Sequence, residues 1–191
     1  MSYELSRRSV LQTVGAAGLA TGLAGCAGDG DDGAAAAAFG ATLSDDGSIP
    51  GHSSVGSAGA AEVDLEGTDE GNLTFEVSYE DLEGPVNGVH IHGDGAADGG
   101  YLVRFFEPSG SEHADEAITT GDLLDADEGS LDGTVRDEHV NPSGDYDGEI
   151  ETVEDLVTEL EKPDLGESGG VVNVHTEFAP DSELAGQLDP Q

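Results

Sequence analysis

Hydrophobic and polar residues alternate along several short stretches of the chain, which is the pattern of β-strands with one buried face. The clearest stretch is residues 73–79, where apolar residues occupy every second position and Thr, Glu and Ser fill the positions between them. Gly- and Ser-rich segments such as residues 48–59 and 93–100 separate these stretches and predict loops. The same pattern predicts further strands over residues 39–44, 60–65, 86–92, 101–106, 131–136, 171–176 and 183–188.

The period of the pattern changes once, within residues 150–162. Val153, Leu156, Val157 and Leu160 fall at the spacing that places apolar side chains on one face of a helix. Acidic residues lie at the N-terminal end of this segment, where they stabilise a helix, and a proline follows its C-terminal end. Short strands joined by Gly-rich turns, with one short helix before the last two strands, predict an all-β fold, an antiparallel β-sandwich.

The charge of the chain changes the list of partners it can have. Its 191 residues include 42 acidic and five basic residues, giving a formal net charge of -37. Such a chain repels phosphate backbones, so we expect no nucleic-acid partner, and it repels anionic membranes unless a covalent group holds it there. The acids are spread along the chain and alternate with apolar residues. This pattern favours a folded, halophilic domain with an acidic surface over a disordered chain. Concentrated salt screens the repulsion between the acidic groups of such a domain.

The first residues have the features of an export signal. Arg7 and Arg8 precede an uncharged, apolar stretch over residues 9–25, and the stretch around the arginine pair resembles a twin-arginine signal. The only cysteine, Cys26, ends a Leu-Ala-Gly-Cys sequence that resembles a lipobox, in which the cysteine carries the lipid. We therefore expect a lipoprotein signal peptide over residues 1–25 and export to the outer face of the cell membrane, with a lipid anchor at Cys26 as the membrane contact.

The residues after the expected anchor divide into a tether and a domain. Residues 26–38 are Gly, Ala and Asp almost throughout and have no periodicity, so they predict a flexible tether. Residues 39–189 contain the predicted strands and form the expected domain. With only one cysteine, no disulfide can form within the chain.

Three histidines are the candidate chemistry of the domain. His90 and His92 lie two residues apart in a predicted strand, so their side chains point to the same face. His175 lies in another predicted strand, and the three imidazoles converge if the two strands are neighbours. Three histidine ligands suit copper or zinc. The alternative is that these histidines only form hydrogen bonds that hold two strands together.

The other histidines and motifs of the sequence do not indicate a catalytic site. His113 lies in an acidic loop and is available as a further ligand, although a solvated loop is the simpler interpretation, and His52 and His139 are expected to be surface histidines. The sequence has no nucleophile elbow, phosphate-binding loop or CxxC pair. Its many acidic pairs do not single out a catalytic dyad. We therefore assign no catalytic residue and expect a protein that is not an enzyme.

Three pieces of the chain together resemble the CHRD domain, a module of chordin and of many microbial secreted proteins. They are the opening Phe-Gly-Ala-Thr-Leu-Ser at residues 39–44, the Val-His-Ile-His-Gly at 89–93, and a closing pair of sequences, Val-Asn-Val-His-Thr at 172–176 and Glu-Leu-Ala-Gly-Gln-Leu at 183–188. The resemblance covers residues 37 to 189. It implies an immunoglobulin-like β-sandwich that acts as an extracellular binding or interaction module with an unknown ligand or protein partner.

The same histidine sequences resemble, more distantly, copper/zinc superoxide dismutase, which shares the sandwich architecture. This resemblance implies that His90, His92 and His175 are copper ligands. The chain departs from that family because no second histidine set for zinc follows His92, with only His113 available. Where the family has a guiding arginine, the chain has Glu183 or nothing basic, and it lacks the structural disulfide. A strongly negative field also repels superoxide.

Two hypotheses follow from the sequence. The first is a lipid-anchored CHRD domain outside the membrane that acts as a binding module and holds a metal through its histidine cluster. The second is a copper-binding, superoxide-dismutase-like protein with redox or dismutase activity at the same three histidines.

Overall fold

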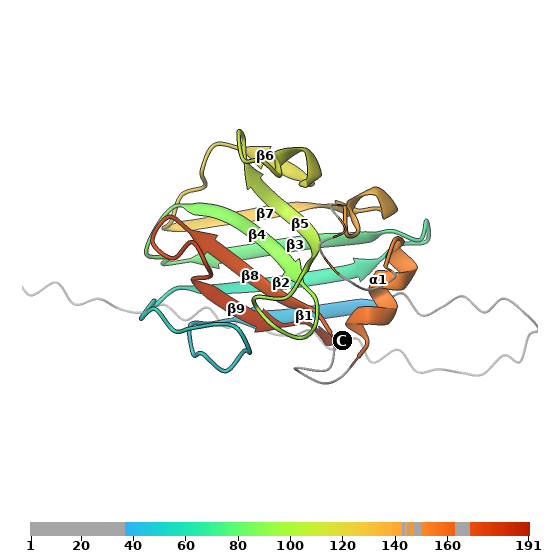
Figure 1. Cartoon of the computed structure of the whole chain (residues 1–191), viewed down its shortest axis with the longest axis horizontal. Helices are drawn as coiled ribbons and strands as arrows, with labels where there is room; N and C mark the ends of the chain where they lie inside the picture. The colour runs from blue at the N-terminus through green and yellow to red at the C-terminus, as the bar shows by residue number, and fades with distance from the viewer. Residues whose placement is uncertain (1–36, 143, 145, 147–149, 163–168) are drawn as a thin grey trace, which may run out of the picture. The chain divides into compact units, whose positions relative to one another are not determined.

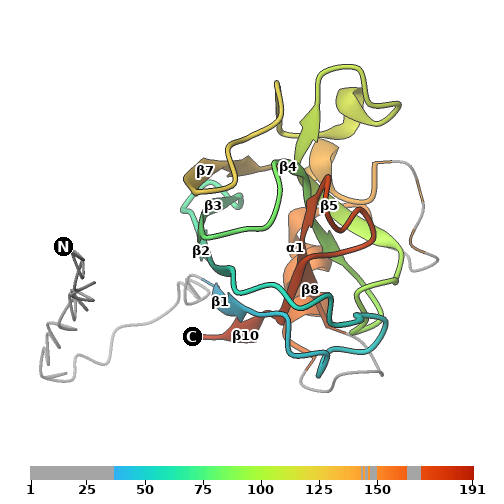
Figure 2. The same ribbon diagram turned by 90° about the vertical axis from the view of Figure 1, so that its left-hand side faces the viewer.

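The computed structural model describes residues 37–142, 144, 146, 150–162 and 169–191. Within these residues the strands form two five-stranded sheets that pack against each other (Figures 1 and 2). The predicted all-β sandwich is therefore confirmed. Arg7, Arg8 and Cys26 lie outside the described residues, so the expected signal and anchor stay predictions.

The first sheet is antiparallel throughout, with the strand order β10-β1-β2-β3-β7. Its side chains alternate between buried and exposed along β2 and β3, as the sequence pattern predicted. Leu65, Phe75 and Val77 on its inner face belong to the main core. The strands of this sheet are β1 (Ala38–Leu43), β2 (Ala60–Gly67), β3 (Leu73–Glu80), β7 (Glu128–Val135) and β10 (Asp189–Pro190).

The second sheet has the order β6-β5-β4-β8-β9 and contains one parallel pair, β5 with β6. Its central strands are buried on both faces, since nearly every residue of β4, β5 and β8 is shielded from solvent. Buried polar side chains on these strands therefore need partners within the protein. The strands are β4 (Val86–His92), β5 (Tyr101–Pro108), β6 (Thr119–Gly121), β8 (Val171–Thr176) and β9 (Leu184–Gln187).

Helix α1 (Val153–Leu160) lies where the change of period predicted a helix, although it is shorter than residues 150–162. Thr152 caps its N-terminus by accepting a hydrogen bond from the main-chain N–H of Asp155 at 3.1 Å. Leu156 and Leu160 are buried in the same core as the sheets. Among the described residues, no helix has the length and apolarity needed to cross a membrane.

Most predicted strands are confirmed, with β4 and β8 matching the predicted bounds. The weakly alternating segments at residues 60–65 and 131–136 form longer strands, β2 and β7. The strands β6 and β10 have three and two residues, too few for a period to be visible, and the sequence did not predict them. Two 3-10 helices, η1 (Ala114–Glu116) and η2 (Asp137–His139), complete the described elements.

The outer face of the first sheet carries rows of like charge. Glu76 in β3 is paired with Asp64 in β2 on one side and with Asp132 in β7 on the other. All three side chains are exposed, so three carboxylates lie side by side across the sheet without a basic residue in the row. Directly opposed like charges destabilise a sheet, and salt reduces the effect by screening. The repulsion that salt is expected to screen is therefore strongest in identifiable places, such as this row of carboxylates.

We predict that Glu76→Lys stabilises the domain in dilute salt. The substitution replaces two repulsive cross-strand pairs by attractive ones, which corresponds to about 1–2 kcal/mol. Thermal unfolding of both proteins in low and in molar salt measures the difference, which should shrink as salt is added. Glu70→Lys is the matched control, because Glu70 lies in the exposed turn between β2 and β3 and its substitution changes the net charge equally. Equal stabilisation by both variants would contradict the prediction.

Candidate metal centre

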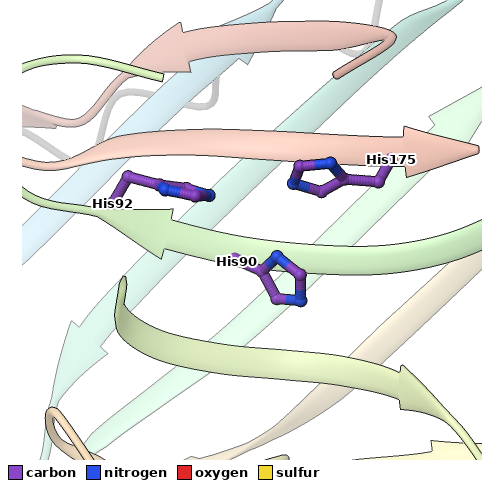
Figure 3. Close-up of side chains that lie close together, drawn as sticks. All are labelled: His90, His92 and His175. Atoms are coloured by element: carbon purple, nitrogen blue, oxygen red, sulfur yellow. The ribbon is translucent and has the colours of Figure 1, made fainter. Parts of the chain in front are cut away.

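Three buried histidines meet on the second sheet. His90 and His92 come from β4 and His175 from β8, as the sequence predicted, and each is at most 7% exposed. The ring centroid of His90 is 4.9 Å from that of His175, and His92 is 5.9 Å from both. Figure 3 shows a nitrogen of each ring turned toward the other rings, and one nitrogen from each lies within 4.8 Å of the other two. Among the described residues this is the one cluster of potential metal ligands.

The pairing of β4 with β8 brings the three rings together. The strands are antiparallel, with His175 opposite Gly88 and Asn173 opposite His90. Alternation sends Val89 into the core and leaves His90 on the other face. Gly88 makes room for the His90 ring, since a Cβ atom at residue 88 would lie 2.8 Å from its Cε1. A side chain at the glycine position of the Gly-x-His-x-His sequence would therefore collide with the first histidine ring.

Each ring has an acceptor for its second nitrogen. His92 Nδ1 lies 2.8 Å from the carbonyl oxygen of Gly99, and His175 Nδ1 lies 3.0 Å from that of Pro180. His90 turns its other nitrogen outward: Nε2 lies 2.9 Å from Oε1 of Glu107, a close contact that is not aligned as a regular hydrogen bond. The remaining atoms, His90 Nδ1, His92 Nε2 and His175 Nε2, are buried and have no hydrogen-bond partner among the described residues.

This arrangement fits a metal ion. Histidines that bind metals usually donate their other ring N–H to a carbonyl or carboxylate, which fixes the ring and its tautomer. Nitrogens bound to one tetrahedral zinc ion lie about 3.4 Å apart, whereas one nitrogen from each ring lies within 4.8 Å of the others, so each ring has to move toward the centre by up to about 0.8 Å. The alternative, in which these histidines only hold strands together by hydrogen bonds, leaves three buried nitrogens unexplained.

Burial keeps the three imidazoles neutral. Desolvation lowers the pKa of His90 to about 3 and that of His92 to about 4, and the neighbouring histidines lower both further. Desolvation also lowers the pKa of His175. At pH 7 each ring therefore carries one lone pair for a cation, because a neutral imidazole has one unprotonated nitrogen.

Asn173 holds the loop that orients His92. Its side chain is fully buried and donates a hydrogen bond to the carbonyl oxygen of Ala97 at 2.8 Å. Ala97 lies in the same loop as Gly99, whose carbonyl oxygen faces His92 Nδ1. In the sequence, this asparagine stands out only as part of the family motif at residues 172–176. Its position two residues before His175 was the available signal, because both side chains then lie on one face of β8.

A buried arginine lies beside the cluster. Arg104 in β5 is 1% exposed, and its Nη1 lies 3.0 Å from Glu107 Oε1 and its Nε 3.1 Å from Glu116 Oε2. Its guanidinium lies 3.7 Å from the ring centroid of Tyr101, which in turn packs on His90 and His92. Arg104 is therefore a basic residue near the site that no sequence motif indicated. The arginine is engaged by two carboxylates and a ring.

Glu107 links this arginine to the histidine cluster. Burial opposes ionisation of its carboxyl group, but the contacts with His90, Ser111 and Arg104 outweigh it and lower the pKa to about 2. The group is therefore a carboxylate at every ordinary pH. No sequence pattern singles out Glu107 among 42 acidic residues.

The remaining histidines lie elsewhere. His113 precedes η1, is partly exposed and contacts Glu116 at 3.2 Å, so it is not part of the cluster. His139 in η2 is partly buried, and its Nδ1 accepts a hydrogen bond from the N–H of Arg136. His52 is buried with its Nε2 3.4 Å from Asp45, so its expected surface position is wrong, because the loop at residues 45–57 folds around the Asp45 carboxylate.

Glu183, which the dismutase resemblance placed at the position of a guiding arginine, is a structural residue. It is fully buried, and its carboxylate accepts hydrogen bonds from Ser57 Oγ at 2.6 Å, Thr176 Oγ1 at 2.5 Å and the N–H of Glu83 at 2.7 Å. These contacts tie two loops to the end of β8. A role in steering an anion is excluded by its charge and its burial.

A comparison with protein families supports the resemblance seen in the sequence. The family model described as the CHRD domain matches residues 39–188. That range includes all three histidines, Gly88, Asn173 and Glu107. No curated protein and no solved structure matches the chain.

We predict that the metal-free domain loses stability in acid through its buried histidines. The unfolded chain protonates histidine near pH 6.5, whereas folded His90 stays neutral down to about pH 3. Between these values the unfolded chain binds more protons, so the free energy of unfolding falls as the pH falls. At pH 4 His90 alone accounts for about 3 kcal/mol.

Urea unfolding of the metal-free protein at pH 7 and pH 4, in equal salt, measures this loss. The loss should be smaller in His90→Gln and unchanged in His113→Gln, whose ring is partly exposed. A loss of equal size in all three proteins would show that the histidine cluster does not cause the acid sensitivity.

Proposed function

Because the chain belongs to the CHRD domain family, we propose that it is an extracytoplasmic binding module, held to the membrane by a lipid, that carries one copper or zinc ion at His90, His92 and His175. The observation that carries the metal proposal is the convergence of three buried nitrogens that have no hydrogen-bond partner in the described part of the chain, each on a ring whose other nitrogen faces an acceptor. Imidazole nitrogens suit both ions, and three of them leave one coordination position open.

The ion would act as a structural clamp between strands and as a contact point for a partner. His90 and His92 lie on β4 and His175 on β8, so one ion would tie two central strands of the second sheet. When bound, the ion supplies a Lewis-acidic position that a donor group of a partner can occupy. The chain's own residues orient the rings through Gly99, Pro180 and Glu107.

The alternative is a copper protein of the dismutase type that uses the same ligands for redox chemistry. The observation in its favour is the position of the three histidines on two neighbouring strands of a sandwich, which the resemblance to that family implies. Two observations weigh against it. Arg104, the basic residue at the site, is already engaged by carboxylates, and a net charge of -37 repels anionic substrates.

Membrane attachment rests on the sequence alone. Arg7, Arg8 and the apolar stretch that follows support export, and Cys26 in its Leu-Ala-Gly-Cys sequence supports lipidation. The domain's first strand begins at Ala38, twelve residues after Cys26. A segment of that length spans at most about 40 Å, so the domain would stay close to the lipid headgroups.

We predict that the chain binds one equivalent of copper(II) or zinc through the histidine cluster. Calorimetric titration in molar salt, on protein carrying Cys26→Ser so that the thiol cannot contribute, gives the stoichiometry. His175→Ala removes one of three ligands and should weaken binding at least 100-fold, whereas His113→Ala, outside the cluster, should leave the affinity within twofold. Binding that survives His175→Ala unchanged would place the metal on surface carboxylates and overturn the proposal.

The same samples distinguish the alternative. Superoxide consumption by the copper-loaded chain, above that of the His175→Ala protein with equal copper, would favour the dismutase-type function. We expect no difference, because Arg104, the basic residue beside the cluster in the described part of the chain, is already paired with carboxylates and cannot attract the substrate.

We also predict that Cys26→Ser releases the exported protein from the membrane. Loss of the thiol removes the group that carries the lipid, and a domain this acidic has no affinity of its own for anionic headgroups. Fractionation of cells that express the unmodified chain and the variant measures the distribution. Retention of the variant in the membrane fraction would refute the lipid anchor.

A further inference from the structure

His90 presents a different nitrogen to the cluster than its two neighbours. His92 and His175 point Nδ1 at main-chain carbonyls and Nε2 at the cluster. His90 instead points Nε2 at Glu107 and turns Nδ1 to the cluster, where it has no hydrogen-bond partner among the described residues. The backbone supplies the acceptors for the first two rings. The acceptor for His90 is a side chain, Glu107 Oε1, at 2.9 Å.

We propose that Glu107 is a positioning residue that fixes the proton of His90 on Nε2 and so makes Nδ1 the atom offered to the metal. This inference rests on the proposed metal site. An ionised carboxylate only accepts hydrogen bonds, so the imidazole nitrogen that faces it carries the proton. The other nitrogen, Nδ1, then keeps its lone pair, and Figure 3 shows a nitrogen of the His90 ring turned toward the other two rings.

Both oxygens of Glu107 are held in place. Oε1 lies 3.0 Å from Arg104 Nη1 as well as facing His90, and Oε2 accepts a hydrogen bond from Ser111 Oγ at 2.9 Å. Arg104 is in turn packed against Tyr101. A carboxylate fixed at both oxygens cannot rotate away from the ring, and a side chain locked in this way keeps a ligand in a productive orientation.

Irregular strand pairing delivers Glu107 to this position. β4 and β5 pair with register shifts between Val89 and His90 and again between Ile91 and His92. Such irregularities redirect side chains relative to a regular ladder. They explain why Glu107, which lies near the end of β5, faces a histidine in the middle of the neighbouring strand.

Glu107 also adds charge that the carbonyls behind the other rings lack. A carboxylate that accepts the N–H of a metal-binding histidine makes the opposite nitrogen a stronger donor. Loss of such a partner typically costs 10- to 100-fold in metal affinity. His90 should therefore be the ligand whose strength depends most on a side chain outside the cluster.

The tautomer can be read in the metal-free protein without any substitution of Glu107. Nitrogen-15 chemical shifts of the imidazole rings at pH 7 distinguish the protonated from the unprotonated nitrogen, and the His90 signals are those missing from His90→Gln. We expect a proton on Nε2 of His90, and a ring with its proton on Nδ1 would overturn the inference. This readout does not depend on whether the protein binds metal.

Two substitutions separate the effect of the acceptor oxygen near His90 Nε2 from the effect of its charge. Glu107→Gln keeps an acceptor oxygen without the charge, so His90 should keep its tautomer while the affinity for zinc falls about tenfold. Glu107→Met removes the acceptor, so the tautomers should mix and the affinity should fall further, toward 100-fold. Glu112→Gln is the control, because the Glu112 side chain is exposed and lies only five residues after Glu107. This substitution should change neither the tautomer of His90 nor the affinity for zinc.

The outcomes distinguish this inference from the proposed function. If the unmodified chain binds zinc and Glu107→Met leaves both the tautomer and the affinity unchanged, the positioning role is wrong and the metal site stands. If the unmodified chain binds no metal, the proposed function is wrong, and the nitrogen shifts still decide whether Glu107 sets the tautomer.

Discussion

Antiparallel pairing of β4 with β8 is the constraint on which the rest of the candidate site depends. This ladder places His175 beside Gly88 and Asn173 beside His90, so the imidazoles meet on one face while Val89 and Ile91 enter the core from the other. The groups that contact the outer nitrogens of the three rings come from the segments next to these two strands. The loop after β4 provides a carbonyl for His92, the turn after β8 provides one for His175, and the shifted register of β5 provides Glu107 for His90.

The energetics explain why such a cluster points to a ligand. Each buried nitrogen without a partner costs about 1–3 kcal/mol, so three of them take a large share of the stability of a domain this size. A bound transition-metal ion offsets that cost, since structural zinc sites are worth about 10 kcal/mol or more. The acidic coat acts separately. Its like-charge rows lie on the outer face of the first sheet, whereas the histidines lie on the second sheet.

Much of this could be predicted from the sequence, because periodicity reports directly on burial. The alternation in β3 and the helical spacing in α1 gave the sandwich, and the spacing of His90 and His92 gave their common face. His175 could be placed beside His90 and His92 only if their two strands were neighbours, and the family resemblance suggested that they are. Glu107 and Arg104 could not be identified, since their position depends on an irregular register. The carbonyls of Gly99 and Pro180 could not either, because every residue has one.

X-ray absorption spectroscopy at the metal edge shows whether the histidine cluster holds the ion, because it reports the atoms bound to that ion. On the chain loaded with one equivalent of zinc in molar salt, we predict a first shell dominated by three imidazole nitrogens at about 2.0–2.1 Å, with the outer-shell scattering of imidazole rings. A first shell of carboxylate or water oxygens without that imidazole scattering would contradict it, since the ion would then lie on the acidic surface and the histidine cluster would be a structural feature of the sheet.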